Sequence, residues 1–272
     1  PFSERFPDRF FDVGIAEQHA TTAAAGMAMS GLRPVVAIYA TFLNRAFDQI
    51  AFDVGLHKQP VIFCLDRAGV TGPDGASHHG LLDMMLMSKI PGMTIFAPSS
   101  YQELQQMFHD ALEITEGPVC IRYPRTPAPI VHESEVGQGT NARKVRSGDD
   151  ACILAVGKML EPAIQAADDL EKSGVQCSVW DVRCVSPLDT KMLTDAHKHP
   201  IVTTIEDGVV EGGIGYTVQS KLSNLNGRGP LVRTLGVPIA YIPQGNPDSI
   251  LSQLGLDSKG IVESIMSSRE LL

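Results

Sequence analysis

Two segments of this sequence contain side chains that could transfer protons: an acid at Glu17, and an acid with an imidazole at Asp74 and His78. Glu17 opens an alanine-rich segment that ends at Gly31, and small residues recur along it at helical spacing. Desolvation against such a closely packed surface raises the proton affinity of a carboxyl, so that it can share a proton with a ring nitrogen. Asp74 and His78, four residues apart in a glycine-rich loop, could orient one another and shuttle protons to a substrate oxygen. Each place also allows a structural role, as an acid favoured at a helix start or as a capped turn beside a solvent-facing histidine.

Two arginines and two aromatic residues could bind a ligand. Arg67 and Arg125 follow different strands, and as a pair they would hold a phosphate well, because guanidinium presents a planar fork of donors. Arg122 lies nearby and competes with Arg125 for that role. Tyr39 and Phe42 leave the end of a strand, where an aromatic side chain offers a stacking face to a flat heteroaromatic ring. The ordinary roles are surface charge for the arginines and core packing for the aromatics.

Apolar strands alternate with helices in the first half of the chain, which predicts a parallel sheet. We expect strands over residues 35–39, 61–65, 93–96 and 119–123, with helical segments over 42–52 and 101–114. Right-handed crossovers then place the loops that follow the strands along one edge, where ligands bind. We also expect an apolar strand end at residues 11–13, followed by a glycine turn and the helix that contains Glu17.

The second half repeats this alternation and predicts a second α/β domain. Its expected strands are residues 151–156, 175–180, 201–205 and 231–235, with a helix over 160–172. Proline and glycine residues between the halves indicate a linker, so the expected domains are 1–126 and 149–272, joined by 127–148. The glycine-rich turn after Glu206 and Asp207 is interpreted as a strand-to-helix connection, since these acids would repel a pyrophosphate.

Composition excludes several classes of function. A net charge of -9 without a basic block argues against nucleic acid as a partner, and the absence of a long apolar run argues against a membrane span. The five cysteines lie mostly in apolar, strand-like runs without a C-x-x-C pair, which favours reduced core residues, no metal site of their own and a cytoplasmic location. The chain begins at Pro1 without an initiator methionine or a signal-peptide layout, so we expect a fragment or the later part of a processed chain.

Three stretches of the sequence resemble one group of enzymes. Residues 14–19 (GIAEQH) and 39–49 (YATFLNRAFDQ) are similar to the pyrimidine-binding domain of thiamine-diphosphate enzymes of the transketolase group. Within that group, residues 66–78 (DRAGVTGPDGASH) resemble the 1-deoxy-D-xylulose-5-phosphate synthase family. The second half resembles, more loosely, the C-terminal domain of that family. The resemblance implies two α/β domains with mainly parallel sheets: a thiamine-diphosphate-binding, pyrimidine-type fold followed by a transketolase C-terminal-like domain.

The resemblance also implies how the coenzyme is bound. Glu17 would bond the ring nitrogen of the aminopyrimidine that is remote from its amino group, and so activate the coenzyme. Tyr39 and Phe42 would flank the ring. The second domain would bind no coenzyme and would mainly support subunit contacts.

Five further residues acquire substrate roles from the resemblance. Asp74 and His78 would handle the substrate, and Arg45 would join them in fixing the carboxylate of the pyruvate-derived species. Arg67 and Arg125 would hold the phosphate of glyceraldehyde 3-phosphate.

Part of a thiamine diphosphate site is missing from the sequence. There is no Gly-Asp-Gly motif, so the ligands of Mg²⁺ and of the diphosphate are expected on an N-terminal half, either removed from a longer polypeptide or supplied as a separate chain. His78 and His79 are adjacent and tend to point apart, which makes the doublet a poor metal chelate. The family usually carries a different polar residue at the second position, and His79 is assigned only to the loop.

The implied activity is that of a thiamine-diphosphate-dependent transferase. Such an enzyme condenses pyruvate, with decarboxylation, and D-glyceraldehyde 3-phosphate to 1-deoxy-D-xylulose 5-phosphate, on the methylerythritol phosphate route to isoprenoids and toward thiamine. We expect a homodimer and an inactive chain when the N-terminal half is absent. The alternatives are a transketolase, a 2-oxoacid dehydrogenase β-type chain, or a non-catalytic dimerisation fragment; residues 66–78 fit the synthase better.

Overall fold

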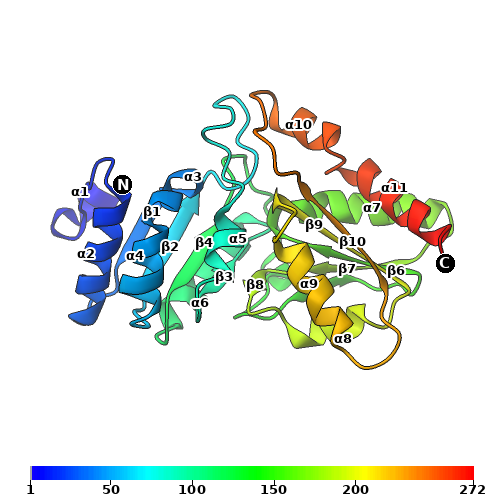
Figure 1. Ribbon diagram of the computed structural model, residues 1–272, viewed down its shortest axis with the longest axis horizontal. Helices are drawn as coiled ribbons and strands as arrows, with labels where there is room; N and C mark the ends of the chain where they lie inside the picture. Colours follow the sequence, from blue (N-terminus) through cyan, green and yellow to red (C-terminus); the bar gives the residue numbers. More distant parts are fainter. Residues whose placement is uncertain (1) are drawn as a thin grey trace.

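Buried apolar runs build two five-stranded sheets, which lie side by side in the molecule (Figure 1). The computed structural model describes residues 2–272. The first sheet has the order β1-β2-β4-β3-β8 and the second the order β10-β9-β6-β7-β5. The predicted class, two α/β domains with mainly parallel sheets, is confirmed: only β8 and β5 run antiparallel to their neighbours.

The elements of the first lobe are helices α1 (Phe2–Arg5), α2 (Glu17–Met29), α3 (Ala40–Leu43), α4 (Phe47–Gln49), α5 (Asp83–Met87) and α6 (Tyr101–Glu113), and strands β1 (Val35–Tyr39), β2 (Ile62–Asp66), β3 (Thr94–Phe96) and β4 (Val119–Arg122). Those of the second lobe are helices α7 (Leu160–Lys172), α8 (Thr190–Ala196), α9 (Ile214–Ser223), α10 (Pro247–Gln253) and α11 (Ser258–Arg269), and strands β5 (Arg143–Arg146), β6 (Ala151–Ala155), β7 (Cys177–Asp181), β8 (Cys184–Ser186), β9 (Ile201–Val209) and β10 (Leu231–Val237). Short 3₁₀ or π segments are η1 (Pro7–Arg9), η2 (Asn44–Ala46), η3 (Ile50–Gly55), η4 (Glu133–Glu135) and η5 (Gly157–Met159).

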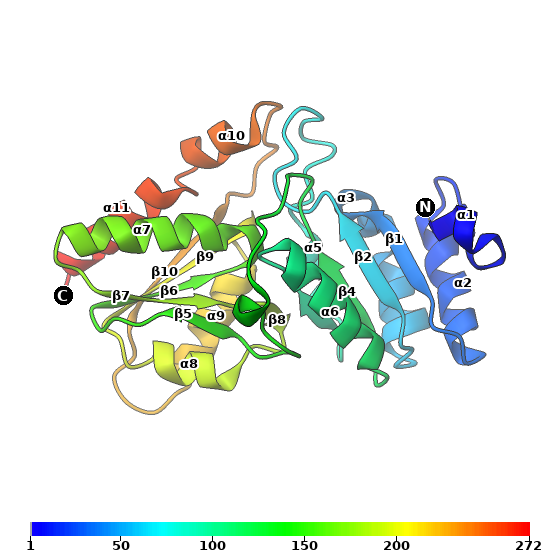
Figure 2. The same ribbon diagram turned by 180° about the vertical axis from the view of Figure 1, so that it is seen from behind.

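Both sheets are covered by helices on both faces, which is why their central strands read as continuous apolar runs. In β2, Phe63 and Leu65 pack with α2, α3 and α5, whereas Ile62 packs with α6 on the other face. In β6, Leu154 faces α8 and α9, whereas Ile153 faces α7 and α11. Figure 2 shows α7 and α11 on one side of the second sheet and α8 on the other.

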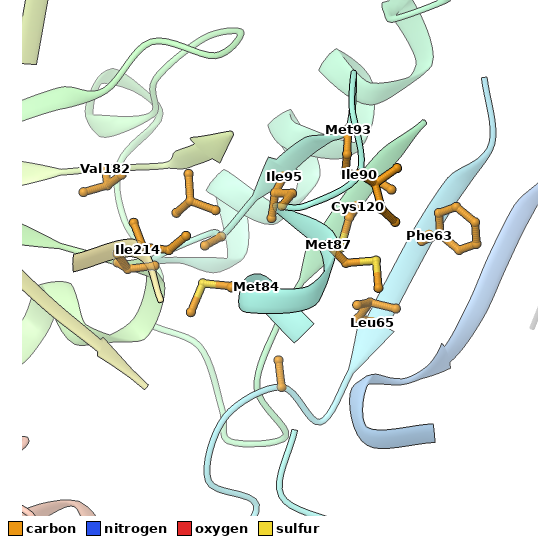
Figure 3. Close-up of a cluster of buried hydrophobic side chains, with 14 of the residues drawn as sticks. Phe63, Leu65, Met84, Met87, Ile90, Met93, Ile95, Cys120, Val182 and Ile214 are labelled. Carbon is orange, nitrogen blue, oxygen red and sulfur yellow. The ribbon is translucent and has the colours of Figure 1, made fainter. Parts of the chain in front are cut away.

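The two lobes share one core. A single buried cluster runs from Phe63 and Met87 of the first lobe to Val182 and Ile214 of the second. Figure 3 shows Met84, on α5, on the side of this cluster that faces Ile214. In addition, β8 comes from the second half of the sequence and pairs antiparallel with β3 of the first sheet. The lobes are therefore held together by apolar packing and by a shared sheet.

The predicted strands of the two sheets and the helices predicted at 101–114 and 160–172 lie close to their expected bounds, β8 and α11 were not predicted, and three expectations need correction. The predicted strand end at residues 11–13 is wrong: these residues belong to no strand, and Phe11 is 64% exposed. The predicted helix over 42–52 is broken into short α, 3₁₀ and π segments, in which Leu43, Ala46 and Ile50 are buried. The expected linker contains β5, which pairs with β7.

Candidate active site

The carboxyl ends of β1, β2 and β4 bring the predicted site residues to one edge of the first sheet. Tyr39 is paired with Asp66, and Leu65 with Arg122, so the last residues of these three strands lie side by side. The loops that follow carry Phe42 and Arg45 after β1, residues 67–80 after β2, and Arg125 after β4. Parallel pairing alone thus gathers segments that are far apart in the chain.

Glu17 is a recessed carboxylate at this edge. It is the first residue of α2 and is only 7% exposed, and Ala20 and Ala24 on the same face are buried against the lobe. Gly14, with φ of 60°, makes the turn that precedes the helix. The nearest cation is Arg45, whose Nη1 lies 3.7 Å from Glu17 Oε2 and whose side chain is 60% exposed. The carboxylate is therefore buried within the lobe but has one solvent-facing cation beside it.

An aromatic row borders the same edge. The rings of Tyr39 and Phe42 are stacked, with centroids 5.6 Å apart and planes 17° apart. The His78 ring meets Phe42 edge-on at 5.3 Å. The guanidinium of Arg67 lies over the ring of Tyr39, 3.8 Å from its centroid. Residues from β1, α3 and the loop after β2 are thus joined through ring contacts.

The loop of residues 67–80 holds its polar groups in specific pairs. The Asp74 carboxylate accepts a hydrogen bond from Arg125 at 2.8 Å, and Nδ1 of His78 lies 2.9 Å from the Ser77 hydroxyl. Asp74 and His78 therefore bind different partners, and the expected mutual orientation is not the arrangement in the structure. Arg67, in a left-handed conformation with φ of 59°, pairs with Asp66.

The structure separates Arg122 from Arg125. Arg122 is 2% exposed, donates from Nε to Asp83 at 2.9 Å and forms a second ion pair with Asp207 of the second lobe. It cannot reach a ligand at the sheet edge without leaving both carboxylates. Arg125 is 46% exposed and remains at the edge.

Sequence reasoning missed the buried ion cluster formed by Arg122, Asp83 and Asp207. Burial raises the pKa of Asp83 even though Arg122 is adjacent. Burial would also raise the pKa of Asp207, but Arg122 and Lys158 outweigh it and hold that pKa below its usual value. Next to them, burial raises the pKa of Glu206 to about 7. The signal in the sequence was an adjacent pair of acids, Glu206 and Asp207, directly after the residues predicted to form a buried strand.

A flat heteroaromatic ring suits the surroundings of Glu17, Tyr39 and Phe42, which offer a carboxylate and an aromatic face at one sheet edge.

Within residues 2–272, no group of three or more His, Cys, Asp or Glu side chains could hold a metal ion. The same described residues contain no helix that is long and apolar enough to cross a bilayer. All five cysteines are buried and free, as predicted, and burial raises the pKa of the Cys64 thiol to about 11.

Comparisons with known proteins agree with this geometry. The transketolase pyrimidine binding domain matches residues 1–129, and the transketolase C-terminal domain matches residues 140–261. The 1-deoxy-D-xylulose-5-phosphate synthase of Magnetococcus marinus is 46% identical over 100% of this chain, and that of Synechococcus sp. strain JA-3-3Ab is 45% identical over 99%. The chain spans only 44% and 42% of the length of these two relatives.

Solved structures give the same result. A split-gene transketolase, described as an inactive beta4 tetramer, matches with a TM-score of 0.89 and 31% identity, over 98% of this chain and 86% of that one. A transketolase variant from Pichia stipitis shares the fold, with a TM-score of 0.79 and 16% identity over 94% of this chain and 37% of that one. The chain therefore belongs to the transketolase family, of which it carries the pyrimidine-binding and C-terminal domains.

Proposed function

We propose that this chain is the C-terminal part of a thiamine-diphosphate-dependent 1-deoxy-D-xylulose-5-phosphate synthase. The reaction is the condensation of pyruvate, with loss of carbon dioxide, and D-glyceraldehyde 3-phosphate. Curated synthases match almost the whole chain at 42–46% identity. The observation that carries the proposal is the buried Glu17 carboxylate at the sheet edge that also bears the stacked Tyr39 and Phe42 rings.

The coenzyme side of the site would use three residues. Glu17 would hold a proton at a nitrogen of the aminopyrimidine, and its burial keeps water from competing for that bond. Tyr39 and Phe42 would seat the ring on their aromatic faces. When bound, thiamine diphosphate supplies the electron sink that decarboxylation of a 2-oxoacid requires. The protein side of the mechanism is therefore orientation and proton control.

The substrate side would use the charged residues around the loop. Arg45, an exposed cation, would bind the carboxylate of pyruvate, and His78, whose ring contacts Phe42, would move a proton at the aldehyde oxygen. Arg125 and Arg67 would bind the phosphate of the acceptor. In the structure both pair with carboxylates, Arg125 with Asp74 and Arg67 with Asp66, so phosphate would replace or share those partners.

Further components would come from outside this chain. An N-terminal half would hold Mg²⁺ and the diphosphate; among residues 2–272 no group of three or more His, Cys, Asp or Glu side chains could hold the metal ion. A second copy would complete a homodimer, and the exposed apolar side chains of Phe11 and Ile15, in the segment before α2, offer such partners a surface. The free, buried cysteines suit a cytoplasmic enzyme.

The test is reconstitution of turnover. The chain is mixed with the N-terminal half of a synthase, and pyruvate consumption that depends on glyceraldehyde 3-phosphate is measured. Glu17→Ala should lower kcat by about 10²–10⁴-fold, the usual contribution of a positioned proton-transfer group. Glu161→Ala, which removes an exposed acid from the first turn of α7, is the matched control. Unchanged turnover in the Glu17 variant would refute the catalytic assignment.

A split transketolase subunit is the second candidate, because the split-gene transketolase covers most of this chain with a TM-score of 0.89. The two candidates differ in the donor substrate. Turnover of a ketose phosphate donor with an aldose acceptor, and none with pyruvate, would favour the transketolase. We also expect the chain alone to bind thiamine diphosphate weakly and without dependence on Mg²⁺, which calorimetry can measure.

A further inference from the structure

The loop of residues 67–80 is docked on the second lobe. Figures 1 and 2 show it, in cyan, beside the orange segment that leads to α10. The backbone N–H of Gly245 donates to the carbonyl of Gly72 at 3.2 Å. A Cβ at Gly72 would lie 2.8 Å from the Gly245 carbonyl oxygen, and one at Gly69 would clash with the Asp207 carboxylate. Glycine therefore lets position 72 approach the backbone of Gly245 and position 69 approach the side chain of Asp207, which a larger residue would not allow.

His79 lies at the centre of this contact. It is 5% exposed, whereas His78 is only partly buried and turns toward Phe42. Its Nδ1 accepts a hydrogen bond from the backbone N–H of Thr71 at 3.0 Å. Its Nε2 lies 3.4 Å from the carbonyl oxygen of Pro243, in the second lobe. One imidazole thus spans the loop and the neighbouring domain.

The two partners determine the proton position on the ring. A backbone N–H can only donate, so Nδ1 must be the acceptor and the proton must be on Nε2, where the Pro243 carbonyl accepts it. The ring therefore acts as a neutral link with one acceptor end and one donor end. A glutamine side chain offers the same two functions at its carbonyl and amide, whereas leucine offers neither.

We infer that His79 is a positioning residue through which the second lobe holds the loop of residues 67–80 in place. The loop carries Asp74 against Arg125 and His78 against Phe42, so its anchor sets where these groups lie. The second domain would thus contribute to the site through the loop it holds. The effect on catalysis rests on the proposed function, but the anchoring itself does not.

Hydrogen–deuterium exchange tests the anchoring on the 272-residue chain. His79→Leu should raise the exchange rate of amides in residues 71–79 and 243–247 by about tenfold or more, because two buried partners lose their bonds. His79→Gln should keep rates within about threefold of the parent. His199→Leu is the matched control: His199 is 7% exposed and bonded through both ring nitrogens, to the carbonyls of Asp195 and Gly148.

Three outcomes would overturn the inference: unchanged exchange in His79→Leu, equal opening in His79→Gln, or equal opening of the loop in His199→Leu. Reconstituted activity gives the second readout. His79→Leu should raise KM for glyceraldehyde 3-phosphate about tenfold with a smaller change in kcat, and His79→Gln should restore it. Absence of synthase activity in the parent, together with the expected exchange pattern, would refute the proposed function and leave the anchoring intact.

Discussion

The domain junction and the candidate active site use the same pairing chemistry in opposite surroundings. At the junction, Arg122 is 2% exposed and is held by Asp83 and Asp207. At the site, Arg125, three residues later, is 46% exposed and has Asp74 as its partner. A buried charge needs an opposite charge beside it, because its lost hydration is costly, whereas an exposed charge can exchange its partner for water or a ligand.

The difference separates two tasks. The junction cluster fixes how the lobes meet, since Asp83 and Arg122 come from the first lobe and Asp207 from the second. The same applies to Arg183, fully buried, which donates to Glu103 of α6 at 2.7 Å and to the carbonyl of Asn141 at 2.6 Å. The exposed pair of Arg125 and Asp74 at the sheet edge contributes little to stability, but both charged groups stay accessible to solvent.

The largest effect that tests this comparison is expected from Arg122→Leu. The substitution leaves Asp83 and Asp207 buried without their main cation, which should lower the free energy of unfolding by about 3–5 kcal/mol. Urea unfolding followed by fluorescence of Trp180, the single tryptophan, measures it. Arg125→Met removes an exposed pair and should change stability by less than about 1 kcal/mol. Equal losses of unfolding free energy in the two variants would contradict the distinction between the junction and the candidate site.

The second effect is a pH dependence that originates at the junction. Because burial raises the pKa of Glu206 to about 7, the folded chain binds a proton there that the unfolded chain has released. Stability should therefore fall as pH rises from the ordinary glutamate pKa toward 7, by on the order of 2–3 kcal/mol from this residue. Glu206→Gln should flatten the profile between pH 5 and 7.5, measured by urea unfolding at each pH. A slope identical to that of the parent would contradict this assignment.

The smallest effect concerns the two arginines at the sheet edge, Arg125 and Arg67. In the reconstituted enzyme, Arg125→Met and Arg67→Met should each raise KM for glyceraldehyde 3-phosphate by about tenfold, the value of one charge-assisted hydrogen bond. The KM for pyruvate should stay within about twofold. Arg269→Met, which removes an exposed charge at the end of α11, is the control. If the site variants matched this control, the arginines would have no phosphate role.

The local sequence pattern was sufficient to predict part of the fold. The helix from Glu17 to Met29, the buried strands and the loop after Asp66 follow from spacing and from the stop signals in the sequence. The polar strand β5 was missed because its side chains are charged: Lys144 pairs with Asp195, and Arg146 with Asp168. Edge strands commonly carry such charges, so an apolar alternation is absent.

Long-range pairing accounts for the remaining differences. The partners Arg122 and Asp207 are 85 residues apart, and nothing near either one marks the other. His79 bonds the carbonyl of Pro243, 164 residues away, so its burial could not be read from its neighbour His78. The strand prediction at residues 11–13 was wrong for the opposite reason, because Phe11 and Val13 are apolar but exposed, and these residues join no sheet.

The position of β8 also affects how the chain is synthesised. The first sheet pairs β3 with residues 184–186, which leave the ribosome well after β4 is complete. At about 5–20 residues per second, the nascent chain waits several seconds with the outer edge of β3 open to wrong strand partners. A ribosome that stalls before residue 184 would therefore present an unfinished sheet to chaperones and proteases. A cut in the connecting segment of the mature chain would leave two pieces that still share a sheet.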